Sequence, residues 1–238
     1  MVRGRGQKHV FDDDHYGPWN TARIKYLEEH FGKSNFKGKT VLEVGCGHGT
    51  VGLALKSWGA DVTFSDGRPE HLDTILKGEN TVEYDLNKTT EWPFKESTYD
   101  IILHFGVLYH LENPEDSIKQ MSKRCNTLIL ESQVLKSSKS EMVFSTETTN
   151  WDAGGFATAL HGKRHIPSYV IVEEWLGNYG FDFQAIKSSA LDKDQKEVKY
   201  AWTDDTLGSV NTPRGFWICN KKRKITPPKR RISQPRAK

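Results

Sequence analysis

Three acidic residues and a cluster of glycines could form one polar site. The stretch LEVGCGHGTVG, residues 42–52, places Glu43 just before four closely spaced glycines, Gly45, Gly47, Gly49 and Gly52. Glycine allows the backbone to turn tightly or to lie against a ligand, so a cluster indicates more than a plain turn. Asp66 and Asp85 end two later apolar runs. Ionised carboxylates only accept hydrogen bonds, which suits these residues to hold a sugar diol or an amino group.

The elements that must position these residues are short β-rich runs separated by helix-like stretches. This alternation predicts a doubly wound, mostly parallel α/β sheet of seven strands, with ligands bound beyond the carboxyl ends of the strands. The five expected parallel strands are TVLEVG (40–45), DVTFSD (61–66), TVEYD (81–85), YDIILHF (99–105) and NTLILESQV (126–134), and FDFQAI and RGFWICN are the expected closing strands. Helices are expected at PWNTARIKYLEEHF, TVGLALKSWG, Pro69 to Leu76, Asn113 onward and SYVIVEEWLGNYG.

Composition restricts the class of protein. The chain has 238 residues, of which 36% are hydrophobic and 27% charged, as expected for a globular domain with a substantial core. No apolar run approaches the roughly 20 residues of a membrane span, and the first residues lack the apolar core of a signal peptide. Cys46, Cys125 and Cys219 are far apart and form no CxxC motif, which argues against a disulfide framework or a zinc site. We therefore expect a cytoplasmic protein.

Charge divides the chain into an acidic body and a basic end. Residues 221–238 contain nine Lys or Arg and no acid, whereas the preceding residues carry 25 basic and 31 acidic side chains. We expect an N-terminal helical cap over 1–35, a catalytic domain over 36–220 and a disordered basic segment over 221–238. The polar, glycine-bearing stretch 134–167 is too long for an ordinary connection and is expected to be a lid insertion.

The glycine-rich stretch resembles a known cofactor-binding motif. Glu43-Val44-Gly45-Cys46-Gly47-His48-Gly49 after an apolar strand is similar to the E/D-x-G-x-G-x-G motif of class I S-adenosylmethionine-dependent methyltransferases. FGVLYHLENPED, residues 105–116, resembles the segment after strand 4 in a branch that includes small-molecule methyltransferases and a wobble-uridine tRNA modifier. The resemblance covers residues 40–133 well and extends to 168–220. It implies a Rossmann-like methyltransferase fold.

The same resemblance implies a set of S-adenosylmethionine contacts. It assigns Asp66 to the ribose diol and Asp85 to the adenine amino group, with Leu86 beside the ring. Glu43 would orient the glycine loop, whose following helix start favours the anionic methionine carboxylate. The remaining residues expected at the cofactor are Gly45, Cys46, Gly47, His48, Gly49, Gly67, Phe105 and Gly106.

Two alternatives to this assignment stay open. Gly47 to Gly52 also fits G-x-G-x-x-G, and Asp66 follows Gly47 by 19 residues, as in a dinucleotide site. An NAD site leaves Glu43 unexplained and requires the helix after Gly52 to begin late. Asp66 and Asp85 could also simply cap the turns that follow them.

Methyl transfer requires alignment of an acceptor and, for a hydroxyl or protonated amine, a general base. His110 is the candidate base, with Tyr109 beside it, because both follow strand 4. His104 lies inside an apolar run and is more typical of a hydrogen-bonded core histidine. Tyr109 and His110 could instead only form the pocket wall.

Further residues are expected around the acceptor. Asn150, Trp151 and Asp152 lie beside glycines in the insertion and suit a substrate cover, although a surface loop is the plainer alternative. Trp19 and Arg23 on the N-terminal helix are expected to close the opposite side. His161 and His165 have the spacing of one helix face but no third ligand, so no metal is expected.

The sequence therefore predicts an enzyme that methylates an oxygen or nitrogen acceptor, most simply on a small molecule. An RNA or tRNA methyltransferase or modifier, aided by the basic segment, is the first alternative. A non-catalytic module that keeps the cofactor fold is the second. A derivative of S-adenosylmethionine, such as its carboxylated form, and the oligomeric state are left open.

Overall fold

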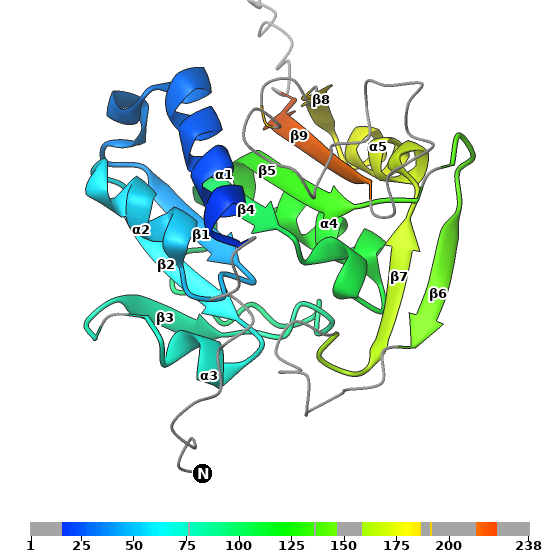
Figure 1. Cartoon of the computed structure of the whole chain (residues 1–238), viewed down its shortest axis with the longest axis horizontal. Helices are drawn as coiled ribbons and strands as arrows, with labels where there is room; N and C mark the ends of the chain where they lie inside the picture. Colours follow the sequence, from blue (N-terminus) through cyan, green and yellow to red (C-terminus); the bar gives the residue numbers. More distant parts are fainter. Residues whose placement is uncertain are drawn as a thin grey trace, which may run out of the picture.

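The computed structural model describes residues 16–75, 77–135, 137–146, 159–186, 191 and 213–222. A seven-stranded sheet in the order β3-β2-β1-β4-β5-β9-β8 forms its centre (Figure 1). The strands β3, β2, β1, β4 and β5 are parallel, whereas β9 is antiparallel to both of its neighbours, β5 and β8. Their bounds are β1 Thr40–Val44, β2 Asp61–Asp66, β3 Asn80–Glu83, β4 Tyr99–Phe105, β5 Cys125–Gln133, β8 Phe181–Ala185 and β9 Arg214–Lys221. The predicted seven-stranded, doubly wound sheet is confirmed.

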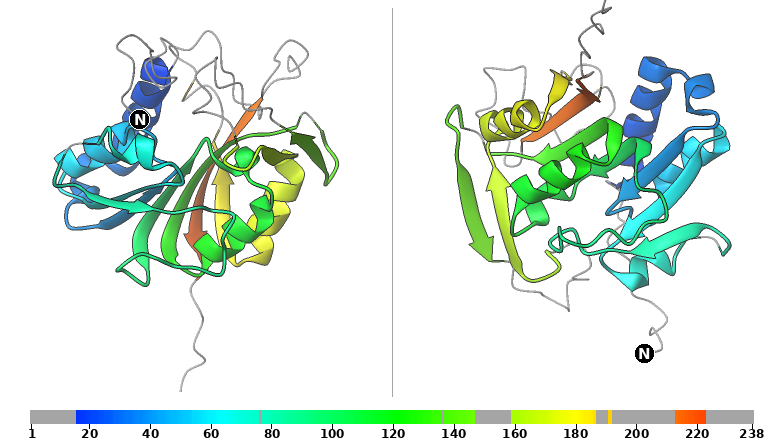
Figure 2. Two further views of the ribbon diagram at one scale, coloured as in Figure 1. Left: turned by 90° about the horizontal axis from the view of Figure 1, so that it is seen from below. Right: turned by 180° about the vertical axis from the view of Figure 1, so that it is seen from behind.

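Helices cover both faces of this sheet (Figure 2). The buried side chains of α1 and α2, among them Leu27 and Leu55, pack with one set of strand residues. Those of α4 and α5, among them Ile118 and Trp175, pack with the opposite set. The helical bounds are α1 Tyr16–Phe31, η2 Lys33–Phe36, α2 Thr50–Ser57, α3 Pro69–Leu72, η3 Leu108–His110, α4 Pro114–Ser122 and α5 Tyr169–Asn178.

Most element boundaries differ by one or two residues from the sequence prediction, and three of the differences matter for the site and the domain limit. The helix that begins at Pro69 ends at Leu72 rather than Leu76, because the Thr74 and Ile75 N–H groups donate to carbonyls three residues back, as in a turn. Strand β3 ends at Glu83, so Asp85 lies two residues beyond it. Strand β9 continues to Lys221, one residue past the domain limit expected at 220.

The insertion expected as a loop contains a second, two-stranded sheet. Strands β6 (Met142–Thr146) and β7 (Lys163–Pro167) pair antiparallel beside the main sheet (Figure 1). Neither strand shows a clear hydrophobic alternation, which is why the sequence pattern failed to reveal them. In the described part of the chain, no helix is long and apolar enough to cross a bilayer.

Candidate active site

A cavity of about 160 Å³ lies where β1, β2, β3 and β4 end, at the edge where open α/β sheets bind ligands. Helix α1 and the start of β9 complete its wall. The cavity brings together nearly all the described residues singled out in the sequence: Trp19, Arg23, Glu43, Gly45, Cys46, Gly47, His48, Asp66, Gly67, Asp85, Leu86, Phe105, Gly106, Tyr109 and His110.

The glycine loop folds closely against the segment that follows β4. Gly45 has a φ of 61°, and a Cβ built on it would lie 2.0 Å from Cγ2 of Val107. A side chain at this position would therefore both strain the backbone and push the two loops apart. Gly49, also expected at the cofactor, is not a lining residue of this cavity; it is the N-cap of α2, and a Cβ there would lie 3.0 Å from the Phe64 ring.

Glu43 connects β1 to the first turn of α2. Its Oε2 accepts a hydrogen bond from the Gly52 N–H at 3.0 Å, so it holds the glycine loop directly. Burial raises the pKa of Glu43 from 4.5 to about 8, although Gly52 and Arg23 oppose this shift. A Cβ on Gly52 would come within 2.5 Å of the same carboxylate oxygen, which explains the fourth glycine.

Asp66 fixes the other side of the glycine loop. Its Oδ2 accepts from the Gly47 N–H and its Oδ1 from the Arg68 N–H, each at 3.0 Å. The Nδ1 atom of His71 also lies 3.0 Å from Oδ1. Since each carboxylate oxygen has two acceptor positions, Asp66 can hold the loop and still accept from a ligand hydroxyl.

Asp85 and Leu86 line the same half of the cavity as the glycine loop and Asp66. The Oδ1 atom of Asp85 accepts from the Asn87 N–H at 3.0 Å, and its Oδ2 lies 2.8 Å from Nε2 of His161. His161 therefore lies in a turn beside an acid, not with His165 on a helix face, because His165 belongs to β7.

Cys46 lines the cavity as a small loop residue. Burial, together with the neighbouring Glu43 and Asp66, raises the pKa of its thiol well above the ordinary value. Because the thiolate is the nucleophilic form, this environment does not activate Cys46.

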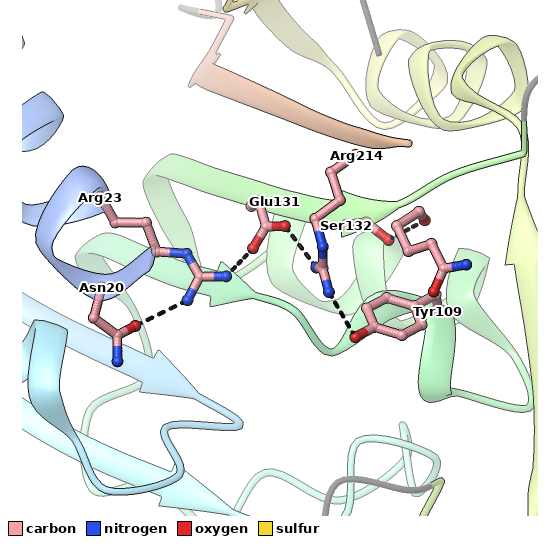
Figure 3. A network of polar contacts seen from close by, with 7 residues as sticks. Asn20, Arg23, Tyr109, Glu131, Ser132 and Arg214 are labelled. Carbon is pink, nitrogen blue, oxygen red and sulfur yellow. Dashed lines mark hydrogen bonds and ion pairs between the residues drawn. The ribbon is translucent and has the colours of Figure 1, made fainter. Parts of the chain in front are cut away.

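A buried network of charges forms the other half of the cavity (Figure 3). Glu131 on β5 is fully buried between Arg23 of α1, with which it forms an ion pair, and Arg214 of β9, whose Nη1 lies 2.6 Å from Oε1. Arg214 also donates from Nη2 to the Tyr109 hydroxyl at 2.9 Å, and Arg23 donates to Asn20 at 3.0 Å. The network thus joins α1, η3, β5 and β9 at one point.

The electrostatics of this network leave one positive charge in excess. Burial alone would raise the pKa of Glu131, but Arg214 and Arg23 hold it below its ordinary value, so the carboxylate stays ionised. Burial opposes the charged form of Arg214 as well, yet Glu131 and Tyr109 raise its pKa. Both guanidinium groups line the cavity, and Arg214 stacks 4.1 Å from the centre of the Trp19 ring. The two cations and one anion therefore favour a negatively charged or oxygen-bearing ligand at this end.

The two candidate histidines have different surroundings. His110 ends η3 and lines the cavity, with its ring 4.0 Å from that of Tyr109. His104 is fully buried in β4, where its Nε2 lies 3.1 Å from the Ser117 hydroxyl, and burial lowers its pKa to about 4. His104 is therefore a core residue, as its apolar context indicated.

Sequence reasoning missed Glu131, Arg214, Asn20 and Leu160. Glu131 gave a signal, because it is an acid inside the apolar run NTLILESQV. Its pairing with Arg23 and Arg214 gave none, since these residues lie 108 and 83 residues away. The predicted acceptor residues Asn150, Trp151 and Asp152 lie outside the described residues.

The sheet order, the antiparallel β9 and the cavity at the strand ends define a Rossmann-like methyltransferase fold. A family model described as a methyltransferase domain matches residues 19–186, which is more than two thirds of the chain. The chain therefore belongs to the class I S-adenosylmethionine-dependent methyltransferases.

Curated relatives and solved structures agree with this family. A mitochondrial ubiquinone biosynthesis O-methyltransferase of Schizosaccharomyces pombe is 30% identical over 115 residues, which are 44% of this chain and 41% of the relative. A tRNA U34 carboxymethyltransferase of Photobacterium profundum is 25% identical over 76% of this chain and 56% of its own length. These alignments thus span about half of each relative.

Two solved structures share the fold. The N-terminal domain of EvdMO1 with bound SAH has a TM-score of 0.63 at 16% identity, covering 92% of this chain and 91% of that one. Magnesium protoporphyrin IX methyltransferase from Synechocystis with bound SAH has a TM-score of 0.57 at 17% identity, covering 92% and 90%.

Proposed function

We propose that this protein transfers a methyl group from S-adenosylmethionine to an oxygen atom of a small-molecule acceptor. The observation that carries the proposal is that one cavity combines the glycine loop and its acids with a cationic, aromatic end. A dinucleotide site would explain the first half of the cavity, formed by the glycine loop and its acids. It would not explain the second half, formed by the cationic, aromatic end.

The residues of the first half fit S-adenosylmethionine. Asp66 has acceptor positions for the ribose diol, and Leu86 offers an apolar wall for the adenine ring near Asp85. Gly45 and Val107, which lie against each other, both line the cavity, and the methionine portion would lie beside them. When bound, the cofactor supplies an activated methyl group on its sulfonium sulfur.

The second half favours oxygen over nitrogen as the acceptor. Two guanidinium groups and one carboxylate give a net positive charge, which repels an ammonium ion and attracts a phenolate, a carboxylate or an alcohol. Trp19 and Tyr109 offer ring surfaces on which a planar acceptor can stack.

The chain's own groups then have distinct tasks. His110 is placed to accept the acceptor's proton, and Trp19 and Phe105 exclude water from the cationic end. Arg214 can only donate, so the Tyr109 oxygen accepts from it and the Tyr109 proton is available to a ligand oxygen. Alignment by these groups is the main catalytic contribution of the protein.

Label transfer from methyl-labelled S-adenosylmethionine to fractionated cell extract tests the proposal. We expect label in the dialysable fraction, and the label should survive both nuclease and protease. Label that remains with macromolecules, or no label in any fraction, would refute small-molecule methylation; the second result favours a non-catalytic module.

Modification of tRNA is the second candidate function. It is supported by the alignment with the tRNA U34 carboxymethyltransferase over three quarters of this chain and by the basic residues near the C-terminus. In the same experiment, this function predicts label that nuclease releases.

A further inference from the structure

The insertion contributes two residues to the cofactor half of the cavity. Leu160 lines the cavity, and its Cδ2 lies 2.9 Å from the position that a Cβ on Gly67 would take. His161, the next residue, lies 2.8 Å from the Asp85 carboxylate. Ala159 just before them is fully buried, so this arm is packed against the domain.

The same arm continues into β7, which is attached to the other half of the cavity. The His165 N–H donates to the Leu111 carbonyl at 2.9 Å, and the His165 ring donates from Nδ1 to the Glu112 carbonyl at 2.7 Å. Both carbonyls follow η3, which carries Tyr109 and His110. One short stretch, residues 159–165, therefore contacts both ends of the cavity.

The chemistry of the His161 contact is directional. An ionised carboxylate only accepts, so Nε2 of His161 donates to Oδ2 of Asp85, while the Asn87 N–H donates to Oδ1. Asn87 Nδ2 also donates to Oδ1, at 3.3 Å. Asp85 is thus held from two sides, and Oδ2 keeps one acceptor position for a ligand amino group. Without His161, only the contacts with Asn87 would hold this carboxylate among the hydrogen bonds described.

We propose that His161 is a positioning residue that orients Asp85 toward the 6-amino group of the adenine ring. Because His161 belongs to the arm that leads into β7, adenine recognition is then coupled to the β6–β7 hairpin. The inference rests on the proposed function and adds a residue and a coupling to its cofactor site.

Binding of two nucleosides separates this role from a merely structural one. S-adenosylhomocysteine carries the 6-amino donor, whereas S-inosylhomocysteine carries an oxygen at that position. Calorimetry on the full-length protein should show that the wild type prefers the adenosine compound by about tenfold or more, the effect of one hydrogen bond to a charged group. His161→Ala should lose most of this preference, and His161→Gln, which retains an N–H donor, should regain part of it.

His165→Ala is the matched control, because it removes a hydrogen-bonded histidine from the same arm without touching Asp85. It should leave the preference between the two compounds unchanged. An unchanged preference in His161→Ala, or an equal loss of affinity for both compounds, would overturn the positioning role. If the wild type binds neither compound, the proposed function itself fails and the inference with it.

Hydrogen exchange tests the coupling by a readout other than affinity. Saturating S-adenosylhomocysteine should slow exchange of the β7 amides in the wild type, and much less so in His161→Ala. Equal protection in both proteins would show that Asp85 and the hairpin are not linked through His161.

Discussion

The Tyr109 hydroxyl accepts a hydrogen bond from Arg214 and keeps its own proton for another acceptor. Asp66 likewise binds the protein and keeps capacity for a ligand, because it accepts from two backbone N–H groups and retains further acceptor positions. At the residue scale, the polar groups of the cavity are thus fixed by the protein on one side and available on the other. Such fixed groups need little rearrangement when a ligand binds.

Asp66→Ala should weaken binding of S-adenosylhomocysteine by about 10- to 100-fold, since a charged hydrogen-bond acceptor is lost. Calorimetry measures this change. Asp61→Ala removes an exposed acid from the other end of the same strand and should leave affinity unaltered. Wild-type affinity in a folded Asp66→Ala protein would contradict the ribose assignment.

His110→Ala should bind the cofactor nearly normally but transfer methyl at a rate lower by about 100-fold or more, because the acceptor's proton loses its base. Single-turnover kinetics measure the rate separately from binding. His30→Ala, an exposed histidine on α1, serves as the control. A wild-type rate in His110→Ala would assign His110 to the pocket wall.

At the scale of elements, Glu131 fastens β5 to both α1 and β9. Glu131→Gln should destabilise the fold by about 3–5 kcal/mol, because it leaves Arg23 and Arg214 buried without their counter-ion. Denaturant unfolding at pH 7 measures this, with the exposed Glu28→Gln as the control. A loss no larger than that of the control would show that the network does not stabilise the fold.

The loss of stability caused by Glu131→Gln should also depend on pH. The pKa of Glu131 is lowered in the folded protein, so its contribution is present above the ordinary value of 4.5 and is lost as pH falls through the folded pKa. The stability difference between wild type and Glu131→Gln should therefore shrink on acidification.

The elements themselves could largely be predicted, whereas their long-range contacts could not. The runs ending at Asp66 and Phe105 carry strong β patterns, and a parallel sheet requires their ends to share one edge. Trp19 and Arg23 were predicted near the cavity, and the structure places them there. Arg214 gave no local signal, because its role depends on β9 pairing beside β5, a tertiary contact that no periodicity encodes.

At the scale of the whole molecule, the acidic body and the basic C-terminal residues meet within β9. Lys221 is its last residue, and the Lys222 N–H donates to the Gly180 carbonyl at 3.0 Å, so both belong to the folded domain. Seven basic residues remain in 223–238. A truncation that tests the basic segment should therefore end after Lys222, not at Asn220.

Removal of residues 223–238 should leave folding and cofactor affinity intact. If the segment contacts about five phosphates of single-stranded RNA, log K should fall with log[salt] at a slope near −3.5 in the full chain, and most of that slope should vanish on truncation. RNA titrations at several salt concentrations measure it. Equal, weak binding by both proteins would remove the nucleic-acid role and favour the small-molecule acceptor.

The position of β9 has a consequence for biosynthesis. Strand β9 lies between β5 and β8, and its first residue, Arg214, completes the cationic end of the cavity. A nascent chain that ends after β8 contains every earlier element. Without β9, however, β8 has no neighbour in the sheet, and Glu131 lacks its ion pair with Arg214. Copies that terminate before Arg214 should consequently be inactive and sensitive to proteases. Partly synthesised chains should therefore be degraded rather than accumulate.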